Sequence, residues 1–337
     1  MKKVFILFIM LAVAGIVILV LKGRTGEKRR GGLPIPAMQK PSARREIAYQ
    51  PGDYRETVLA GERERSYLLY IPRGFDEQKK YPLLFGFHGG NGSGEKFARQ
   101  TDLDAAADRE GFVAVFPDGI EHNWNDGRDT TDAYKAGADD IAFVRALVES
   151  LKAKLPIDEK RIYATGVSNG GVFSHRLACE TADIFGAVGP VSGLMATKFV
   201  PRCNPSGTVS VVAIHGTADQ GMPIQGGDQQ GGFAVLGDGG VLESAESTRK
   251  FWASRNGCNL TPSTANLPPR VNDGTSVVKI HYSGCRNNTE VIYYVVNGMG
   301  HSWPPKKPQA PRIAGPTSQN INATEVIWEF FKTHPRE

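Results

Sequence analysis

Residues 161–176 read Arg-Ile-Tyr-Ala-Thr-Gly-Val-Ser-Asn-Gly-Gly-Val-Phe-Ser-His-Arg. A short β-prone run at residues 162–164 leads into Gly-x-Ser-x-Gly at residues 166–170, and a helix-like pattern follows at once. Strand, sharp turn and helix in this order predict a nucleophile elbow, in which backbone strain lifts the hydroxyl of Ser168 above the edge of a sheet. The flanking glycines are needed because a β-carbon there would collide with the neighbouring strand or helix. The pattern also occurs at ordinary Ser/Gly-rich helix entries, so partner residues elsewhere must decide its function.

Continuous apolar runs recur along the chain, and such runs are typical of strands that are covered on both faces of a sheet. They occupy residues 82–87, 112–116, 187–191 and 209–214, and further strands are expected at residues 67–71 and 291–296. Helix-period segments lie at residues 139–155, 243–255 and 323–333. Strands that alternate with helices predict an α/β fold with a mostly parallel central sheet and helices on both faces.

The N-terminal segment is strongly apolar. Residues 4–21 are all apolar or glycine, and at about 1.5 Å per residue they would cover roughly 27 Å of helix, close to the hydrocarbon thickness of a bilayer. We therefore expect residues 1–21 to be an uncleaved membrane anchor rather than a cleavable signal segment. Residues 22–45 are basic and rich in Gly and Pro, which favours an extended linker, and residues 46–337 suit one large domain.

Charge is unevenly distributed along the chain. The formal net charge is +5, but residues 1–45 hold ten Lys or Arg residues and a single Glu. The remainder has 30 basic and 34 acidic residues, a net charge of −4. A mildly acidic body gives no support to nucleic-acid binding, so we expect no nucleic-acid partner.

The four cysteines help to predict the cellular compartment in which the body of the protein lies. They show no close paired spacing of the kind found in zinc sites, and their even number allows three disulfide pairings or four reduced, buried thiols. We predict that sequential neighbours pair, Cys179 with Cys203 and Cys258 with Cys285, each closing a loop of about 25 residues and stabilising the fold by about 3–4 kcal/mol. The basic residues after the apolar segment favour a cytoplasmic body by the positive-inside rule. Disulfides favour export instead, and we place the body in the periplasm or outside the cell.

A serine nucleophile needs a base that is itself oriented by a carboxylate, and in this fold type the acid precedes the histidine along the chain. Five histidines follow Ser168: His175, His215, His281, His301 and His334. His301 lies on a glycine-rich loop directly after the strand expected at residues 291–296, where it could face the serine, whereas His215 ends a buried strand and suits a core role. Asp219 lies in the loop after residues 209–214 and is the expected acid, although Asp is also common in plain turns.

The negatively charged tetrahedral intermediate needs two backbone N–H donors. Asn169, directly after the serine, is expected to supply one. The glycine-rich loop at residues 87–94 is expected to supply the other from Gly89 or Gly90, because glycine lets the main chain approach a ligand closely. A phosphate-binding loop is a weaker interpretation, since the Lys-Ser/Thr ending of a P-loop is missing.

From about residue 54 to residue 335 the chain resembles the extracellular esterases grouped as poly(3-hydroxybutyrate) depolymerase-like, feruloyl and acetylxylan esterases. The resemblance rests on residues 88–94, 116–119, 124–127, 166–170, 215–219 with Pro223, 300–304 and 325–331. It implies an α/β-hydrolase fold, a Ser168–Asp219–His301 triad, and no metal or organic cofactor. Asn91 and Met299 stand where many members have glycine, and the glycine-rich residues 221–240 are less typical.

These observations predict an exported serine esterase that works through an acyl-enzyme, tethered to the membrane by residues 4–21 if they are not cleaved. The expected substrates are feruloyl or acetyl esters on plant polysaccharide. A depolymerase of poly(3-hydroxybutyrate) or its oligomers, an acyltransferase, and a binding protein on an inactive scaffold are the alternatives. Trp303 and Trp124 are expected to contact substrate, because indole rings stack on aromatic acids and sugars, unless both rings are packed under loops.

Overall fold

The computed structural model describes residues 48–230, 233, 238–308 and 311–337. The membrane anchor expected at residues 1–21 and the linker expected at residues 22–45 lie outside these ranges. Within the ranges, no helix combines the length and the apolar character needed to cross a membrane.

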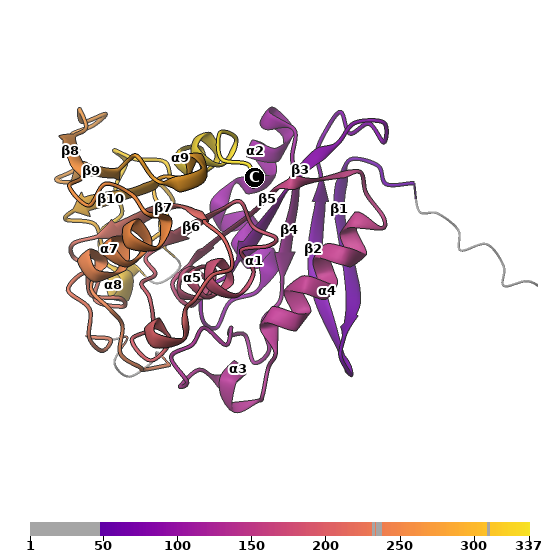
Figure 1. The fold of residues 1–337 in the computed structure, drawn as a ribbon, viewed down its shortest axis with the longest axis horizontal. Helices are drawn as coiled ribbons and strands as arrows, with labels where there is room; N and C mark the ends of the chain where they lie inside the picture. The colour runs from indigo at the N-terminus through magenta and orange to yellow at the C-terminus, as the bar shows by residue number, and fades with distance from the viewer. Residues whose placement is uncertain (1–47, 231–232, 234–237, 309–310) are drawn as a thin grey trace, which may run out of the picture. The chain divides into compact units, whose positions relative to one another are not determined.

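A ten-stranded sheet runs through the body in the order β1-β2-β4-β3-β5-β6-β7-β10-β9-β8 (Figure 1). The six central strands, β4-β3-β5-β6-β7-β10, run parallel to one another. At one end of the sheet β2 pairs antiparallel with β4 and β1 with β2, and at the other end β9 pairs antiparallel with β10 and β8 with β9. The mostly parallel sheet confirms the predicted fold class. The strands are β1 Gly52–Ala60, β2 Arg63–Ile71, β3 Tyr81–Phe87, β4 Val113–Pro117, β5 Ile157–Val167, β6 Ala187–Val191, β7 Ser210–Gly216, β8 Ser263–Asn266, β9 Ser276–Tyr282 and β10 Val291–Asn297.

Helices cover both faces of this sheet (Figure 1). On one face α4, α5 and α7 contribute Phe143, Phe173 and Trp252 to one hydrophobic core, and on the other α1, α2 and α9 pack in a second core that includes Phe97 and Phe331. Strands between two cores need apolar side chains on both sides, which explains the continuous apolar runs in the sequence. The helices are α1 Gly94–Thr101, α2 Leu103–Glu110, α3 Asp132–Lys135, α4 Asp140–Lys152, α5 Asn169–Glu180, α7 Ala245–Asn256, α8 Pro311–Ala314 and α9 Ala323–Phe331, with short 3₁₀ turns η1 Val200–Arg202 and η2 Arg286–Asn288.

The sequence patterns did not predict the outermost strands, β1 and β8. Strand β1 alternates half-buried and exposed residues, and every residue of β8 is exposed. Their conformation is set by backbone pairing with β2 and β9 rather than by burial, so their own side chains carry a weak signal.

Two disulfides join Cys179 to Cys203 and Cys258 to Cys285, as predicted. The first disulfide joins the end of α5 to the residue that follows η1. The second joins Cys258, two residues after the end of α7, to the turn that follows β9. Both therefore fasten connections on the α5/α7 side of the molecule to neighbouring loops.

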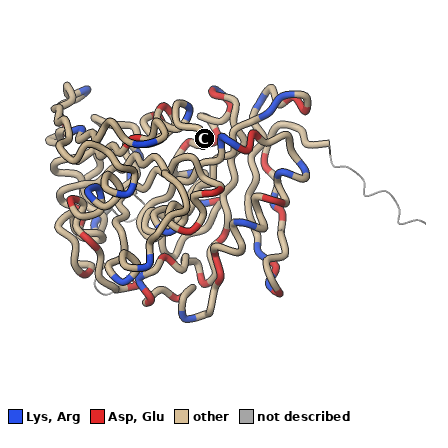
Figure 2. Tube along the Cα trace, viewed as in Figure 1, with Lys and Arg blue, Asp and Glu red and all other residues tan. Residues whose placement is uncertain are grey.

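Positive and negative residues are interspersed along the described trace (Figure 2). Most ion pairs are solvent-exposed, such as Arg145 with Asp183. Arg128 differs, because its side chain and that of Asp126 are both fully buried and lie 2.8 Å apart. Losing one partner of a buried pair leaves an uncompensated buried charge and therefore costs more stability than losing one partner of an exposed pair.

Candidate active site

The predicted elbow forms at Ser168, between the end of β5 and the start of α5. Ser168 has φ 57° and ψ −125°, in a region that residues other than glycine rarely adopt. A β-carbon at Gly170 would lie 2.2 Å from the carbonyl oxygen of Phe87, and one at Gly166 would lie 2.5 Å from the backbone of Gly170. Both glycines are therefore required by close backbone contact, and the strained serine between them is the kind of outlier that marks functional sites.

His301 and Asp219 meet at the same end of the sheet. Nδ1 of His301 lies 2.9 Å from both carboxylate oxygens of Asp219, and the Met222 N–H donates to Oδ1 of Asp219 over 2.8 Å. Burial alone would raise the pKa of Asp219, but His301, with its hydrogen bond, and the Met222 N–H together hold this pKa below its ordinary value. Asp219 therefore stays ionised at neutral pH, which keeps the proton of neutral His301 on Nδ1 and leaves Nε2 as an acceptor.

His215 takes the core role that was predicted for it. Its side chain is buried, its Nε2 lies 2.6 Å from the carbonyl oxygen of Met222, and burial lowers its pKa. It lies 3.8 Å from Asp219, beyond hydrogen-bond distance. The structure thus pairs Asp219 with His301 rather than with His215.

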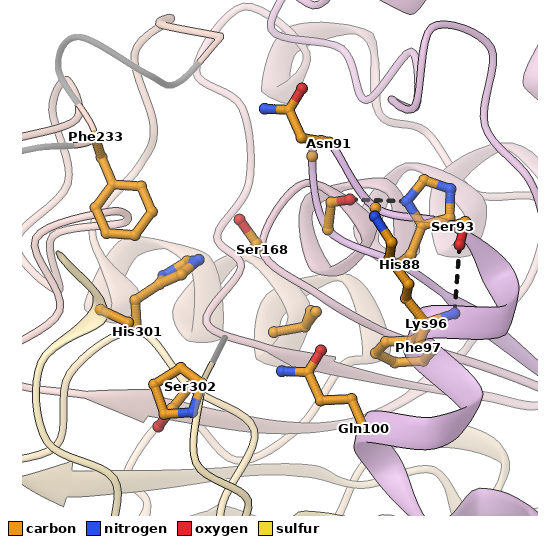
Figure 3. Close-up of a pocket in the computed structure, with 16 residues that line it drawn as sticks. His88, Asn91, Ser93, Lys96, Phe97, Gln100, Ser168, Phe233, His301 and Ser302 are labelled. Atoms are coloured by element: carbon orange, nitrogen blue, oxygen red, sulfur yellow. Dashed lines mark hydrogen bonds between the residues drawn. The ribbon is translucent and has the colours of Figure 1, made fainter. Parts of the chain in front are cut away.

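Ser168 and His301 line one cavity of about 200 Å³ (Figure 3). Gly89 and Gly90 line it as well, and a β-carbon at Gly89 would lie 3.2 Å from Cβ of Ser168. The cavity therefore brings together the serine, the histidine and the glycine loop that the sequence singled out, with Asp219 behind the histidine. Among the residues that the structure describes, no group of three or more His, Cys, Asp or Glu side chains is arranged to hold a metal ion.

The peptide between Gly89 and Gly90 is fixed by His88. The Gly119 N–H donates to Nε2 of His88 over 3.0 Å, so the other nitrogen, Nδ1, carries the proton and donates to the Gly89 carbonyl oxygen over 2.7 Å. Burial lowers the pKa of His88 to about 4, so the ring is neutral at neutral pH. Because the C=O and N–H of a trans peptide point in opposite directions, His88 also sets the direction of the Gly90 N–H.

Asn169 is held by a separate network. Its Oδ1 accepts a hydrogen bond from the Trp124 N–H over 2.8 Å. Its Nδ2 donates to the Trp124 carbonyl oxygen over 3.0 Å and to Oδ2 of Asp126 over 2.7 Å. Asp126 is in turn paired with Arg128. As the first residue of α5, Asn169 has a backbone N–H without an intrahelical partner, and its side-chain contacts fix the direction of that N–H.

The structure contradicts the substrate contacts expected of Trp124 and Trp303. Neither side chain has any exposed surface, and neither lines the cavity. Trp124 stacks on Phe173 and donates to the His88 carbonyl oxygen, while Trp303 packs edge-on against Phe97 and donates to a threonine hydroxyl. Both indoles support the loops that form the site, because a buried indole needs one polar partner and otherwise fills apolar space.

The cavity residues that the sequence patterns did not single out include Phe233, Lys96 and Gln100. The Phe233 ring lies 4.8 Å from the His301 ring at an angle of 60°, and it belongs to the glycine-rich residues 221–240. Gly221 of the same segment approaches His301 so closely that a β-carbon would lie 2.9 Å from Nδ1. A lone aromatic residue within a glycine-rich stretch was the available signal for Phe233.

Comparisons with known proteins agree on a family. The family model described as "Esterase PHB depolymerase" matches residues 65–202. The probable feruloyl esterase C of Aspergillus terreus is 30% identical over 274 residues, covering 79% of this chain and 83% of the relative. A proposed esterase of Nocardia uniformis, NocK, is 28% identical over 313 residues, covering 88% and 90%.

Two solved structures have a fold similar to that of this chain. An acetyl xylan esterase from Aspergillus awamori superposes with a TM-score of 0.55 at 13% identity, covering 83% of this chain and 99% of that one. A ferulic acid esterase from Anaeromyces mucronatus gives a TM-score of 0.51 at 16% identity, covering 86% and 93%.

Proposed function

The chain belongs to the PHB depolymerase and feruloyl esterase family and is a carboxylic ester hydrolase, and from this premise we propose that Ser168, Asp219 and His301 form its catalytic triad. The observation that carries the proposal is the His301–Asp219 hydrogen bond at a cavity that the strained Ser168 also lines. A strained serine, a histidine and an ionised carboxylate are the parts that acyl transfer needs.

In the proposed reaction, Oγ of Ser168 attacks the ester carbonyl carbon while Nε2 of His301 takes the hydroxyl proton. Asp219 stabilises the resulting imidazolium without taking the proton itself. The tetrahedral oxyanion accepts hydrogen bonds from the backbone N–H of Gly90 and Asn169. His301 then protonates the departing alkoxide, the acyl group stays on Ser168, and a water molecule activated by His301 releases the acid.

Mutagenesis tests the triad. Ser168→Ala and His301→Ala should each lower kcat on a p-nitrophenyl ester by on the order of a millionfold, and Asp219→Asn should cost somewhat less because the carboxylate transfers no proton. A fluorophosphonate should label the wild type on Ser168. His281→Gln, which changes a half-buried histidine on β9, is the matched control. Retention of most activity in His301→Ala would refute the assignment of the base.

For the substrate, we propose feruloyl or acetyl esters carried on plant polysaccharide. The support is that relatives are named as feruloyl esterases and that a solved structure of similar fold is an acetyl xylan esterase. Phe233 beside His301 adds an apolar ring at the cavity. Product analysis on methyl ferulate and acetylated xylan tests this proposal.

The family model favours hydroxybutyrate polyesters as a second candidate substrate. Faster hydrolysis of hydroxybutyrate oligomers than of any feruloyl or acetyl ester would replace the first choice. An acyltransferase would reveal itself by ester products when a sugar acceptor is added, because the acyl-enzyme would then react with an alcohol in place of water.

We propose that the protein is exported, since two disulfides suit an oxidising compartment. Fractionation of cells that express the full chain, followed by immunoblotting, tests this location. Recovery of the protein in the cytoplasm with four free thiols would contradict it.

A further inference from the structure

The wall of the cavity opposite His301 is made by α1, which follows the glycine loop directly. Lys96 and Gln100 lie one turn apart on this helix, and both side chains extend toward the cavity (Figure 3). Residues four apart share one face of a helix, so the two side chains form one polar surface.

Lys96 is the single Lys or Arg among the described residues that line the cavity, and the same lining contains no Asp or Glu. No described carboxylate forms an ion pair with the Lys96 ammonium, whereas Arg99 on the same helix is paired with Glu95. The Lys96 side chain is exposed to solvent, so a substrate can reach its charge.

Two carboxylates near this wall, those of Asp118 and Asp238, already have partners. Asp118 accepts hydrogen bonds from the Gly94 N–H at 2.9 Å and from the Ser66 hydroxyl at 2.7 Å. Asp238, which would lie 3.4 Å from a β-carbon at Gly90, faces the buried guanidinium of Arg128. The Lys96 ammonium is therefore available to form an ion pair with a ligand in the cavity.

Resting on the esterase function proposed above, we infer that Lys96 binds a carboxylate of the substrate, with Gln100 donating beside it. A carboxylate could be carried by the acyl group, as in a half-ester of a dicarboxylic acid, or by the alcohol, as in an ester on an acidic sugar polymer. The chemistry at Lys96 is the same in both cases: an ammonium paired with a carboxylate near the scissile ester.

Two matched substrate pairs separate these sources. Mono-p-nitrophenyl adipate against its neutral methyl ester places the charge on the acyl group, and p-acetoxybenzoate against methyl p-acetoxybenzoate places it on the alcohol. The measured quantity is the ratio of kcat/KM for the anionic ester to kcat/KM for its neutral partner. Comparing this ratio between variants cancels the intrinsic reactivity of each ester.

In Lys96→Met the ratio should fall by about fivefold for at least one pair, the effect of losing about 1 kcal/mol of ion pairing, and in Lys96→Glu it should fall further. Arg99→Met removes the same charge from the same helix outside the cavity and should keep the wild-type ratio. Added salt should lower the wild-type ratio and leave the Lys96→Met ratio unchanged.

Unchanged ratios in Lys96→Met for both pairs, or an equal fall in Arg99→Met, would overturn the inference. Neither result would touch the proposed esterase function, which is measured by hydrolysis of the neutral esters and its loss in Ser168→Ala.

Discussion

Replacing His88 by Gln should remove one defined contribution to the pH dependence of this protein's stability. The His88 ring is enclosed between the Gly119 N–H and the Gly89 carbonyl oxygen, and it bonds to both in its neutral form. Protonation would place a hydrogen on Nε2, where the Gly119 N–H already points. Burial lowers the pKa of His88 to about 4 in the folded protein.

The magnitude follows from the difference between the folded and unfolded chains. Lowering the pKa of His88 from the ordinary value of 6.5 to about 4 makes the free energy of unfolding depend on pH by about 3 kcal/mol in total. Because the folded pKa is the lower one, the unfolded chain binds the proton first as the pH falls. The contribution is fully present above about pH 6.5 and is lost progressively down to about pH 4. Between about pH 7.5 and about pH 4.5 the wild type should lose about 2.5 kcal/mol through His88 alone.

Urea unfolding at these two pH values, followed by tryptophan fluorescence, measures the effect. The free energy of unfolding should fall between the two pH values by about 2.5 kcal/mol less in His88→Gln than in the wild type. His175 and His215, which are also buried with lowered pKa, titrate in both proteins and cancel in the comparison. His122→Gln, which removes an exposed histidine from a nearby loop, is the control.

The same variant should lower kcat more than it raises KM, because the Gly89–Gly90 peptide loses the ring that orients it toward the proposed oxyanion position. An equal loss of unfolding free energy between the two pH values in wild type and His88→Gln would refute this role of His88. The same loss in His122→Gln as in the His88 variant would also refute it.

Two further predictions concern stability. Arg128→Met should lower the free energy of unfolding by about 3–5 kcal/mol, because it leaves the buried carboxylate of Asp126 and the partly buried carboxylate of Asp238 without their cation. Arg145→Met, which breaks an exposed pair, should cost less than about 1 kcal/mol, and equal losses in chemical denaturation would contradict this account. The double variant Cys179→Ala/Cys203→Ala should lose about 3 kcal/mol relative to the oxidised wild type. An unchanged urea midpoint would show that this crosslink does not stabilise the fold.

The sequence alone determined the parts of this protein that depend on local backbone requirements or on order along the chain. Gly166 is required by contact with Gly170 in the same strand-turn-helix unit, and Gly170 is required by contact with the end of the neighbouring strand β3. The strand-turn-helix pattern of about a dozen residues was nevertheless enough to predict the elbow at Ser168. Apolar runs identified the central strands because burial on both faces excludes polar residues there. Asp219 and His301 could be proposed as partners because loops that follow parallel strands gather at one edge of a sheet.

The tertiary structure alone decided where the side chains of the loops point. Trp124 and Trp303 lie in loops near the site, yet both rings turn into the interior, because Phe173 and Phe97 arrive from other elements to cover them. Position in the chain places a loop, whereas contacts with residues distant in sequence set the direction of its side chains.

Arg128 is a charged residue whose contacts the sequence likewise could not reveal. Its charge is buried against Asp238, 110 residues further along the chain. No pattern around Arg128 reveals that partner, just as none around Lys96 or Phe233 reveals the cavity that they share. A sequence pattern reports the backbone and the burial of its own segment, while a site assembled from distant segments exists only after the chain has packed.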